Sequence, residues 1–484
     1  MRNRFIFIYL LFPLSISAQT SGTYTLKQSI EIALANNISM KQSQASVESN
    51  TISLKQAKIN RYPSLNAGAS QSYNFGRSVN PYDNTVVANQ QVNSNNLSLT
   101  SNLNIFSGFQ NTYSIQQKAL IVKASKEDVG TTRNNIVLGV VESYANVLSN
   151  KAILLSSQSQ FEGTNAQIDR TEKLVQAGRL PVTNLYDLKA QLATEETNIV
   201  LAENNLELAK LTLAQWMQVD PSLIQDVQEP SVVVDERSEK TATEVFAIAE
   251  PNQPQIIAAK TRVMSADKSI SMAKSSFYPS LNFQAGLFTN YSSIAKRFVP
   301  GQPLTTPVLT PNPFLVLKDL DGNIVPYYLN QVSYTESPRT ENLNFNDQFD
   351  NNLRKGFSFN LSIPIFNALQ SRYSVETAKI NRLNAQLQLD EQKNQLRQTI
   401  ETAVANEKAA RKRLQAIEKQ ISALEESFRS SEQRFNLGVL NAVDFLLVKN
   451  NLARAQNDKS RYRYDFFIRR ALLDFYLGKE LNFN

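Results

Sequence analysis

The sequence contains no cysteine and no histidine. The first absence excludes disulfide bonds and the lipid-modified N-terminal cysteine that some exported proteins carry. The second removes the commonest general base and metal ligand of proteins. An enzyme built on this chain would need a carboxylate pair or a Ser/Lys site, and most of its Asp and Glu residues fall on predicted helix faces, where solvation explains them. We therefore expect no catalytic residue, no metal site and no cofactor.

Long apolar runs are also missing after the N-terminus. A membrane-spanning helix needs about 18 apolar residues, and no later segment approaches that length. The start of the chain differs, because Arg2 and Arg4 precede an apolar run from Phe5 to Leu14. A short segment rich in small residues follows and ends at Ala18. This pattern predicts a secretory signal peptide over residues 1–18 and an exported protein. A transmembrane anchor is the alternative, but the run is short and polar sequence follows it.

Charge of one sign is nowhere concentrated. The formal charge of +7 is spread along the 484 residues, and no dense Lys/Arg tract stands beside aromatic residues. Such a distribution is typical of ordinary solubility rather than of nucleic-acid binding. We therefore expect no nucleic-acid partner.

The chain does contain one sequence pattern that occurs twice. The matched segments are 57–66 and 273–282, which share Tyr-Pro-Ser-Leu-Asn, then 104–106 and 364–366, which share Ile-Phe, and finally 178–180 and 438–440. The offset is about 216 residues for the first match and about 260 for the later two, so the second copy carries about 44 extra residues. We predict an internal two-fold repeat, with the first copy at 19–243, including a linker at about 217–243, and the second at 244–484.

Each copy holds two segments in which apolar and polar residues alternate with a period of two. The first pair lies within about 64–106 and the second within about 279–366. The apolar series are Leu65, Ala67, Ala69, Tyr73 and Phe75; Leu97, Leu99, Leu103 and Ile105; Leu281, Phe283, Ala285 and Leu287; and Phe357, Phe359, Leu361, Ile363 and Ile365. Alternation over about ten residues predicts strands of the length that crosses a bilayer when tilted.

The composition of these strands favours a membrane over a soluble sheet lying on a core. Their polar faces are uncharged and rich in Asn and Ser, as expected for a water-filled lumen, and their ends are aromatic. Four strands cannot close into a barrel, and open edges in hydrocarbon would leave backbone groups unpaired. The strands must therefore pair with those of other copies, where three chains would give twelve strands and two a tight eight.

The second strand pair is joined by a long loop at about 290–355. It contains Pro300, Pro303, Pro307, Pro311, Pro313, Pro326 and Pro338. Long irregular loops lie on the outer face of membrane barrels, so we expect this loop to be extracellular. A lid, a surface-exposed patch and plain tolerated length remain open as its role.

After each strand pair the sequence predicts very long helices. No proline occurs from Phe109 to Ala177, and one helix of that length would measure about 100 Å. Heptad-like spacing predicts supercoiled packing. The spaced positions are Leu185, Leu188, Leu192, Glu195, Ile199, Ala202, Leu206, Ala209, Leu213 and Trp216 in the first copy and Leu414, Ile417, Ile421, Leu424, Phe428 and Phe435 in the second.

Each long helical stretch is interrupted once, near 178–184 and near 438–444. A Gly after a helix end supplies a left-handed cap, and Thr183 or Asn184 and Asn441 or Asp444 can begin the next helix. These are predicted hairpin tips. They are either simple turns or the far mouth of a helical tube with a docking surface, and we favour the second because both copies repeat the turn in one register.

Taken together, these features resemble the TolC-like outer membrane efflux protein family. The likeness covers nearly all of the mature chain and extends to its close, from Asn451-Leu452-Ala453-Arg454-Ala455 to Leu477-Gly478. It implies a mainly α fold with a membrane β-barrel part, in which a long α-helical coiled-coil tunnel extends into the periplasm. A homotrimer would complete a twelve-stranded barrel in the outer membrane lipid. Its partners would be a periplasmic adaptor (membrane fusion) protein and an inner-membrane pump of the RND, ABC or MFS type.

The same resemblance suggests which residues act. It implies that the adaptor docks at the tips, at Gly178, Arg179, Leu180, Gly438, Val439 and Leu440. It also implies that the periplasmic aperture is formed by Thr183, Asn184, Asp187, Phe435 and Asp444. The Tyr and Arg that close the mouth in some members are not matched, since Phe435 and Leu440 stand there. Asp444 maps to an acidic ring, which would favour cations, although a helix cap is the simpler reading.

Two functions are therefore weighed. The leading one is the passive exit duct of a tripartite efflux or secretion system, whose cargo the pump selects. The alternative is a non-transporting coiled-coil scaffold or adhesin at the cell surface, which would have no use for four alternating segments with aromatic ends.

Overall fold

The structure is a computed structural model that describes residues 22–79, 84, 86–87, 91–229, 240–301, 315–327 and 339–478. The described residues divide into a helical unit, which takes in those up to Lys55, Ser114–Ile270 and those from Glu376 onward, and a strand unit within Gln56–Tyr113 and Ser271–Val375. The predicted signal peptide, part of the linker and most prolines of the second loop lie outside the described residues.

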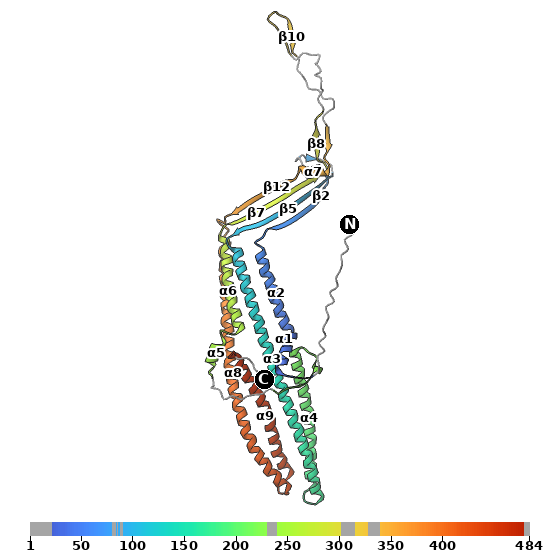
Figure 1. Cartoon of the computed structure of the whole chain (residues 1–484), viewed down its shortest axis with the longest axis vertical. Helices are drawn as coiled ribbons and strands as arrows, with labels where there is room; N and C mark the ends of the chain where they lie inside the picture. The colour runs from blue at the N-terminus through green and yellow to red at the C-terminus, as the bar shows by residue number, and fades with distance from the viewer. Residues whose placement is uncertain are drawn as a thin grey trace. The chain divides into compact units, whose positions relative to one another are not determined.

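Two long helical hairpins make up most of the helical unit (Figure 1). The first is α3 (Gln110–Gln176) followed by α4 (Val182–Met217), and the second is α8 (Gln370–Asn436) followed by α9 (Ala442–Tyr476). The prediction of one helix between Phe109 and Ala177 is confirmed, and α3 and α8 have 67 residues each. The shorter helices are α1 (Leu26–Asn36), α2 (Ile38–Ile59), α5 (Ala242–Ala249) and α6 (Pro254–Lys274).

The spaced apolar positions of α4 and α8 form the seams along which these helices pack. Leu188 and Leu213 are fully buried, and Ala202 and Ala209 nearly so. Trp216 departs from the pattern, because 37% of its surface is exposed. Among the described helices, none combines the length and the apolar character needed to cross a membrane.

A small parallel pair of strands lies against the middle of α3. It joins β1 (Gly22–Tyr24) to β6 (Ile224–Val227), which follows the short 3-10 turn η1 (Pro221–Leu223). The buried Tyr144 hydroxyl of α3 lies 2.9 Å from the carbonyl oxygen of Tyr24 and 2.6 Å from that of Gln228. Lys151 adds an ion pair of 2.6 Å to Asp226. One helix therefore fixes both the start of the described chain and the segment that follows α4.

The strand unit is centred on a four-stranded antiparallel sheet with the order β12-β7-β5-β2 (Figure 1). Its strands are β2 (Ser64–Asn74), β5 (Val92–Ser107), β7 (Ser280–Ser292) and β12 (Arg354–Ser362). The smaller elements are β3 (Ser78–Val79), β4 (Val86–Val87), β8 (Lys296–Val299), β9 (Leu315–Lys318), β10 (Ile324–Tyr327), β11 (Arg339–Asn342), the 3-10 turn η2 (Ser275–Phe277) and α7 (Phe345–Asn351).

The register of the sheet places the alternating apolar residues on one shared face. Leu99 lies between Ala67 and Leu287, and Phe283 lies between Leu103 and Phe359. The opposite face carries rows of polar residues, among them Asn104, Asn282 and Asn360. Because side chains alternate between faces along a strand, this register gives the sheet one apolar and one polar surface.

The end of the fourth strand differs from the sequence-based expectation. The alternation predicted a strand that includes Ile363 and Ile365, but β12 ends at Ser362. Pro364 has no backbone N–H to donate to a neighbouring strand, and it restricts the residue before it. The second strand also differs, because an irregularity between Asn104 and Phe106 brings Phe106, rather than Ile105, opposite Leu281.

We predict that Gly139→Ala disturbs the packing of α3 against α4. A Cβ atom at this position would lie 2.5 Å from the Trp216 ring, which is rigid and must move away. Overpacking of this kind destabilises by about 1–3 kcal/mol. Because Trp216 is the one tryptophan of the chain, its fluorescence emission reports the displacement directly.

Gly163→Ala is the matched control, since Gly163 lies in the same helix and nothing is within 4 Å of its added Cβ. It should leave the emission spectrum unchanged and raise helix stability by up to about 1 kcal/mol. Equal spectra for the two variants would contradict the packing described for Trp216.

Candidate aperture at the helical tips

The two hairpin tips have the same backbone structure. At the first, Gly178 N–H donates to the Val175 carbonyl at 3.0 Å and Arg179 N–H donates to that of Leu174 at 2.9 Å. At the second, Gly438 N–H donates to Phe435 at 3.0 Å and Val439 N–H to Arg434 at 2.9 Å. This is the Schellman end of a helix, and it needs a left-handed residue, which the glycines supply with φ of +66° and +76°.

The tips touch each other. A Cβ atom added to Gly438 would lie 3.6 Å from the Arg179 carbonyl oxygen and 3.7 Å from a methyl carbon of Leu180. Leu180 is accordingly buried, at 8% exposure, whereas Gly178, Arg179, Gly438 and Val439 are exposed. Leu440 is half-buried. Of the residues expected to dock a partner, four are thus accessible and Leu180 instead joins one tip to the other.

Behind the tips lies an apolar cluster drawn from all four long helices. Its buried members are Ile168, Leu185, Leu188, Phe435, Ala442 and Phe445. The Phe435 and Phe445 rings are stacked, with centroids 4.7 Å apart and an interplanar angle of 12°. Phe435 is fully buried, so the expectation that it lines an aperture is not supported. An aromatic ring at this seam position stabilises the contact between the hairpins.

The other four residues expected at the aperture differ in how far their side chains are exposed. Thr183 and Asp444 are exposed, Asp187 is half-buried and Asn184 is buried at 7%. Asp444 follows the N-cap of α9, where the Asn441 side chain accepts from its backbone N–H at 2.9 Å and donates to its carboxylate at 2.9 Å. The N-cap of α9 is thus Asn441, and Asp444 is an acidic residue of the first helical turn that bonds to this cap rather than the cap itself. Its exposure leaves the carboxylate free to act electrostatically as well.

A buried ion pair lies next to this cluster and was not predicted. The Lys449 ammonium of α9 is 3.0 Å from the Glu195 carboxylate of α4, with side chains only 12% and 4% exposed. Both groups also hydrogen-bond the Thr164 hydroxyl of α3. Burial lowers the pKa of Lys449, and the attraction of Glu195 opposes that shift. The pair therefore joins α9 of the second hairpin to both helices of the first.

Neutral side chains extend this connection. Gln191 of α4 and Asn450 of α9 exchange two hydrogen bonds, of 3.0 and 3.2 Å, and Gln191 also donates to Glu195 at 2.9 Å. Gln167 of α3 donates to Asn436 of α8 at 3.2 Å. Within one chain the two hairpins are thus held together by polar contacts from all four helices.

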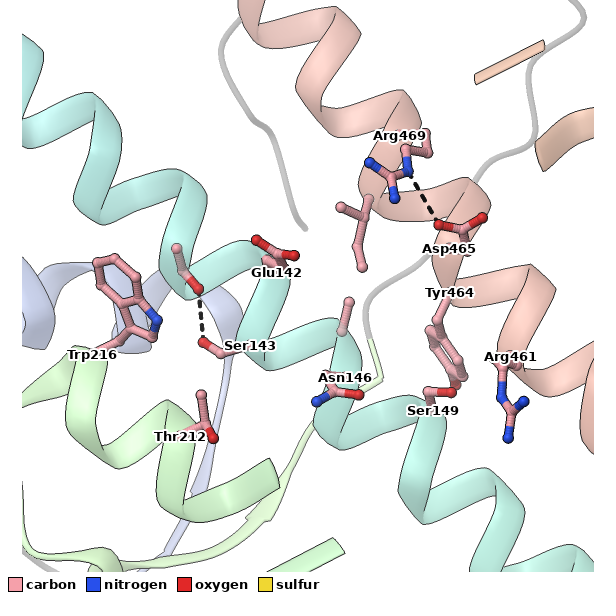
Figure 2. Close-up of a pocket in the computed structure, with 13 residues that line it drawn as sticks. Glu142, Ser143, Asn146, Ser149, Thr212, Trp216, Arg461, Tyr464, Asp465 and Arg469 are labelled. Atoms are coloured by element: carbon pink, nitrogen blue, oxygen red, sulfur yellow. Dashed lines mark hydrogen bonds and ion pairs between the residues drawn. The ribbon is translucent and has the colours of Figure 1, made fainter. Parts of the chain in front are cut away.

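A second feature of the helical unit is a polar cleft of about 430 Å³ between α3, α4 and α9 (Figure 2). Trp216 and Thr212 border it on one side and Tyr464, Asp465 and Arg469 on the other. Asp465 is paired with Arg469 at 3.1 Å and with Arg413 at 3.5 Å. Among the described residues, no group of Asp and Glu is arranged to hold a metal ion.

The profile of the family described as outer membrane efflux protein matches residues 29–217 and 329–479. These two stretches contain both hairpins and both tips. The chain belongs to the outer membrane efflux protein family.

Individual proteins also resemble the chain in sequence or in fold. The outer membrane protein TolC of Escherichia coli is 22% identical over 422 residues, which cover 86% of this chain and 74% of the relative. The outer membrane protein VceC of Vibrio cholerae has a similar structure, with a TM-score of 0.71 at 16% identity over 94% of this chain and 97% of that one. The Campylobacter jejuni outer membrane channel CmeC gives 0.71 at 16% identity, over 96% and 90%.

Several sequence-based expectations are confirmed by these findings. The chain is an outer membrane efflux channel of the TolC type, it serves as an exit duct, and it belongs to a family of channels rather than of enzymes. The mainly helical fold with a strand part is confirmed as well. The non-transporting scaffold is thereby set aside.

We predict that Glu195→Gln loosens the tips. Removing one partner of a buried ion pair leaves the other charge uncompensated, at about 3–5 kcal/mol, so amide hydrogen exchange around Lys449 should rise by more than about 100-fold. The double variant Glu195→Gln/Lys449→Met removes both charges and should recover much of the protection. Hydrogen exchange followed by mass spectrometry measures this, and a double variant that exchanges as fast as Glu195→Gln, or faster, would show that the two charges are not coupled.

Proposed function

We propose that three copies of this chain form the duct, with each sheet contributing four strands to a twelve-stranded barrel. The observation that carries the proposal is the sheet order β12-β7-β5-β2. Among the described residues, β2 and β12 each pair on one side only. Within hydrocarbon each unsatisfied backbone group costs several kcal/mol. Pairing β12 of one copy with β2 of the next would satisfy both edges and close the ring.

The two faces of the sheet support a position in the membrane. The apolar face of the sheet carries the odd-numbered residues of its strands and is called here the odd-numbered face. Its large apolar side chains are exposed, with Leu65 at 69%, Phe357 at 73% and Leu361 at 62%. A soluble sheet would bury such residues against a core. The opposite face carries Asn, Ser and Gln, which suit a water-filled lumen. We infer that the odd-numbered face meets lipid and that the helices line a conduit in the periplasm.

The tips would form the periplasmic aperture and the docking surface. Leu437 is 78% exposed and Val439 66%, at the outermost turn of the second hairpin. Exposed aliphatic side chains at a tip suit a protein partner, and the resemblance names a periplasmic adaptor coupled to an RND, ABC or MFS pump. Three copies of Asp444 around the mouth would give a negative constriction that favours cations.

We predict that Asp444→Asn reduces cation selectivity without loosening the structure. Asparagine keeps an acceptor for the Asn441 amide group, while the ring of negative charge disappears. Reversal potentials of the purified channel in planar bilayers under a salt gradient measure the change. Unaltered selectivity would refute a role for Asp444 in the aperture and leave it as a residue that bonds to the cap.

We predict that Val439→Asp abolishes export while assembly stays intact. A carboxylate at this exposed position opposes docking to an apolar surface but meets solvent in the free channel. Complementation of a deletion strain, followed by dye accumulation, reports export, and native mass spectrometry in detergent reports three chains per particle. Full complementation by the variant would contradict docking at Val439, and a particle of one chain would contradict the trimer itself.

A further inference from the structure

A short helix in the second loop lies on the apolar face of the sheet. The Thr289 hydroxyl of β7 donates to the Phe349 carbonyl of α7 at 2.8 Å, and the Tyr291 ring lies 5.5 Å from that of Phe345. Thr289 and Tyr291 continue the odd-numbered series of β7 beyond Leu287. The register pairs Thr289 with Leu97 of β5. Helix α7 therefore covers the end of the odd-numbered face that is nearer the loops.

This helix is held firmly for its size. Its Gln348 side chain is fully buried, accepts from Ser292 N–H at 2.8 Å, and donates to the carbonyls of Ser292 at 3.0 Å and Leu343 at 2.9 Å. Just after the helix, Asn352 donates to the Asn290 carbonyl at 2.7 Å. Seven residues are too few for a stable helix in water. These bonds to β7 fix its orientation.

The fixed orientation leaves an aromatic stripe exposed. Phe345 and Phe349 are four residues apart, pack against each other at 6.1 Å, and remain 45% and 38% exposed. Residues at this spacing share one face of a helix. Asp347 lies about 200° around the axis from Phe345 and is exposed on the other side. A helix with one aromatic and one acidic face, held in place by a buried glutamine, suits a boundary between apolar and aqueous surroundings.

The neighbouring residues indicate lipid rather than a second copy of the chain. Helix α7 packs against Leu97 of β5 and against Thr289 and Tyr291 of β7. Strand β12 begins opposite Phe288, and beyond that point Gln348 of α7 bonds the backbone N–H and carbonyl of Ser292, so a strand of a second copy could not pair there. Lys355 lies at the same end of β12 and on the same face as Phe357. Lysine beside an apolar band is typical of side chains that reach to lipid phosphates.

We propose that α7 is an interfacial anchor that inserts Phe345 and Phe349 at the boundary between the acyl chains and the headgroups of the outer leaflet. The inference rests on the proposed function, since it requires the odd-numbered face to meet lipid. Amphipathic helices of this kind are buried by about 5–10 Å at the headgroup boundary. The anchor would fix the vertical position of the sheet and hold the base of the long second loop at the membrane surface.

The test uses tryptophan fluorescence in the full chain, which has one native tryptophan to remove. In a Trp216→Phe background, Phe349→Trp places a reporter on the proposed anchor. Asp347→Trp places it on the opposite side of the same helix, and Phe359→Trp places it in the middle of the lipid-facing sheet. Each variant is reconstituted in phosphatidylcholine vesicles whose acyl chains carry bromine either near the headgroup or near the chain end.

We expect the emission of the Phe349→Trp variant to be quenched about twofold more strongly by shallow than by deep bromine, as an interfacial position requires. The Phe359→Trp variant should respond more to deep bromine, and the Asp347→Trp variant should respond to neither. If Phe359→Trp is quenched and Phe349→Trp is not, the anchor is wrong while the membrane sheet stands. A blue-shifted but unquenched Phe349→Trp variant would show that a protein surface covers α7 instead. If neither reporter is quenched, the membrane position of the sheet is itself wrong.

Discussion

The pairing of backbone groups at the edges of one small sheet is the constraint on which the rest of the account depends. Strands β2 and β12 leave N–H and C=O groups without a strand neighbour among the described residues. Water can satisfy such groups, but hydrocarbon cannot. In the assembly that we propose, the chain shares these edges with other copies of itself, which pairs the free groups. Assembly is then a requirement of the backbone itself, and the apolar face only decides where the assembled sheet lies.

Helical packing meets a different demand, which is to hold two hairpins together inside each chain. Stacked Phe435 and Phe445 supply apolar contact, and Lys449 and Glu195 supply a buried ion pair beside it. A buried pair is poor evidence of net stability, since desolvation offsets much of the attraction. We infer that the pair contributes to specificity, because the alignment of the hairpins in this structure satisfies both charges and the Thr164 hydroxyl together. Movement at the aperture would then carry the two tips together, unless these contacts break.

Much of the fold could be predicted from the sequence, because hydrophobic periodicity and the positions of Gly and Pro are local signals. The absence of proline predicted the length of α3, and Gly178 and Gly438 predicted the tips. The ion pair could not be predicted in the same way, since Lys449 and Glu195 are 254 residues apart in sequence and meet only through tertiary packing. A signal was present, however: Glu195 is a charged residue within an otherwise apolar heptad series, and such a residue calls for a partner. Helix α7 was missed because seven residues in a proline-rich loop carry too little periodicity.

Cross-linking of the sheet edges tests the central claim most directly. The chain has no cysteine, so pairs introduced one on β2 and one on β12 report without background. If the edges of neighbouring copies are paired, one register of cysteine pairs will form intermolecular disulfides in the membrane and give a covalently closed ring of three chains. Disulfides only within single chains, or none in any register, would contradict the account.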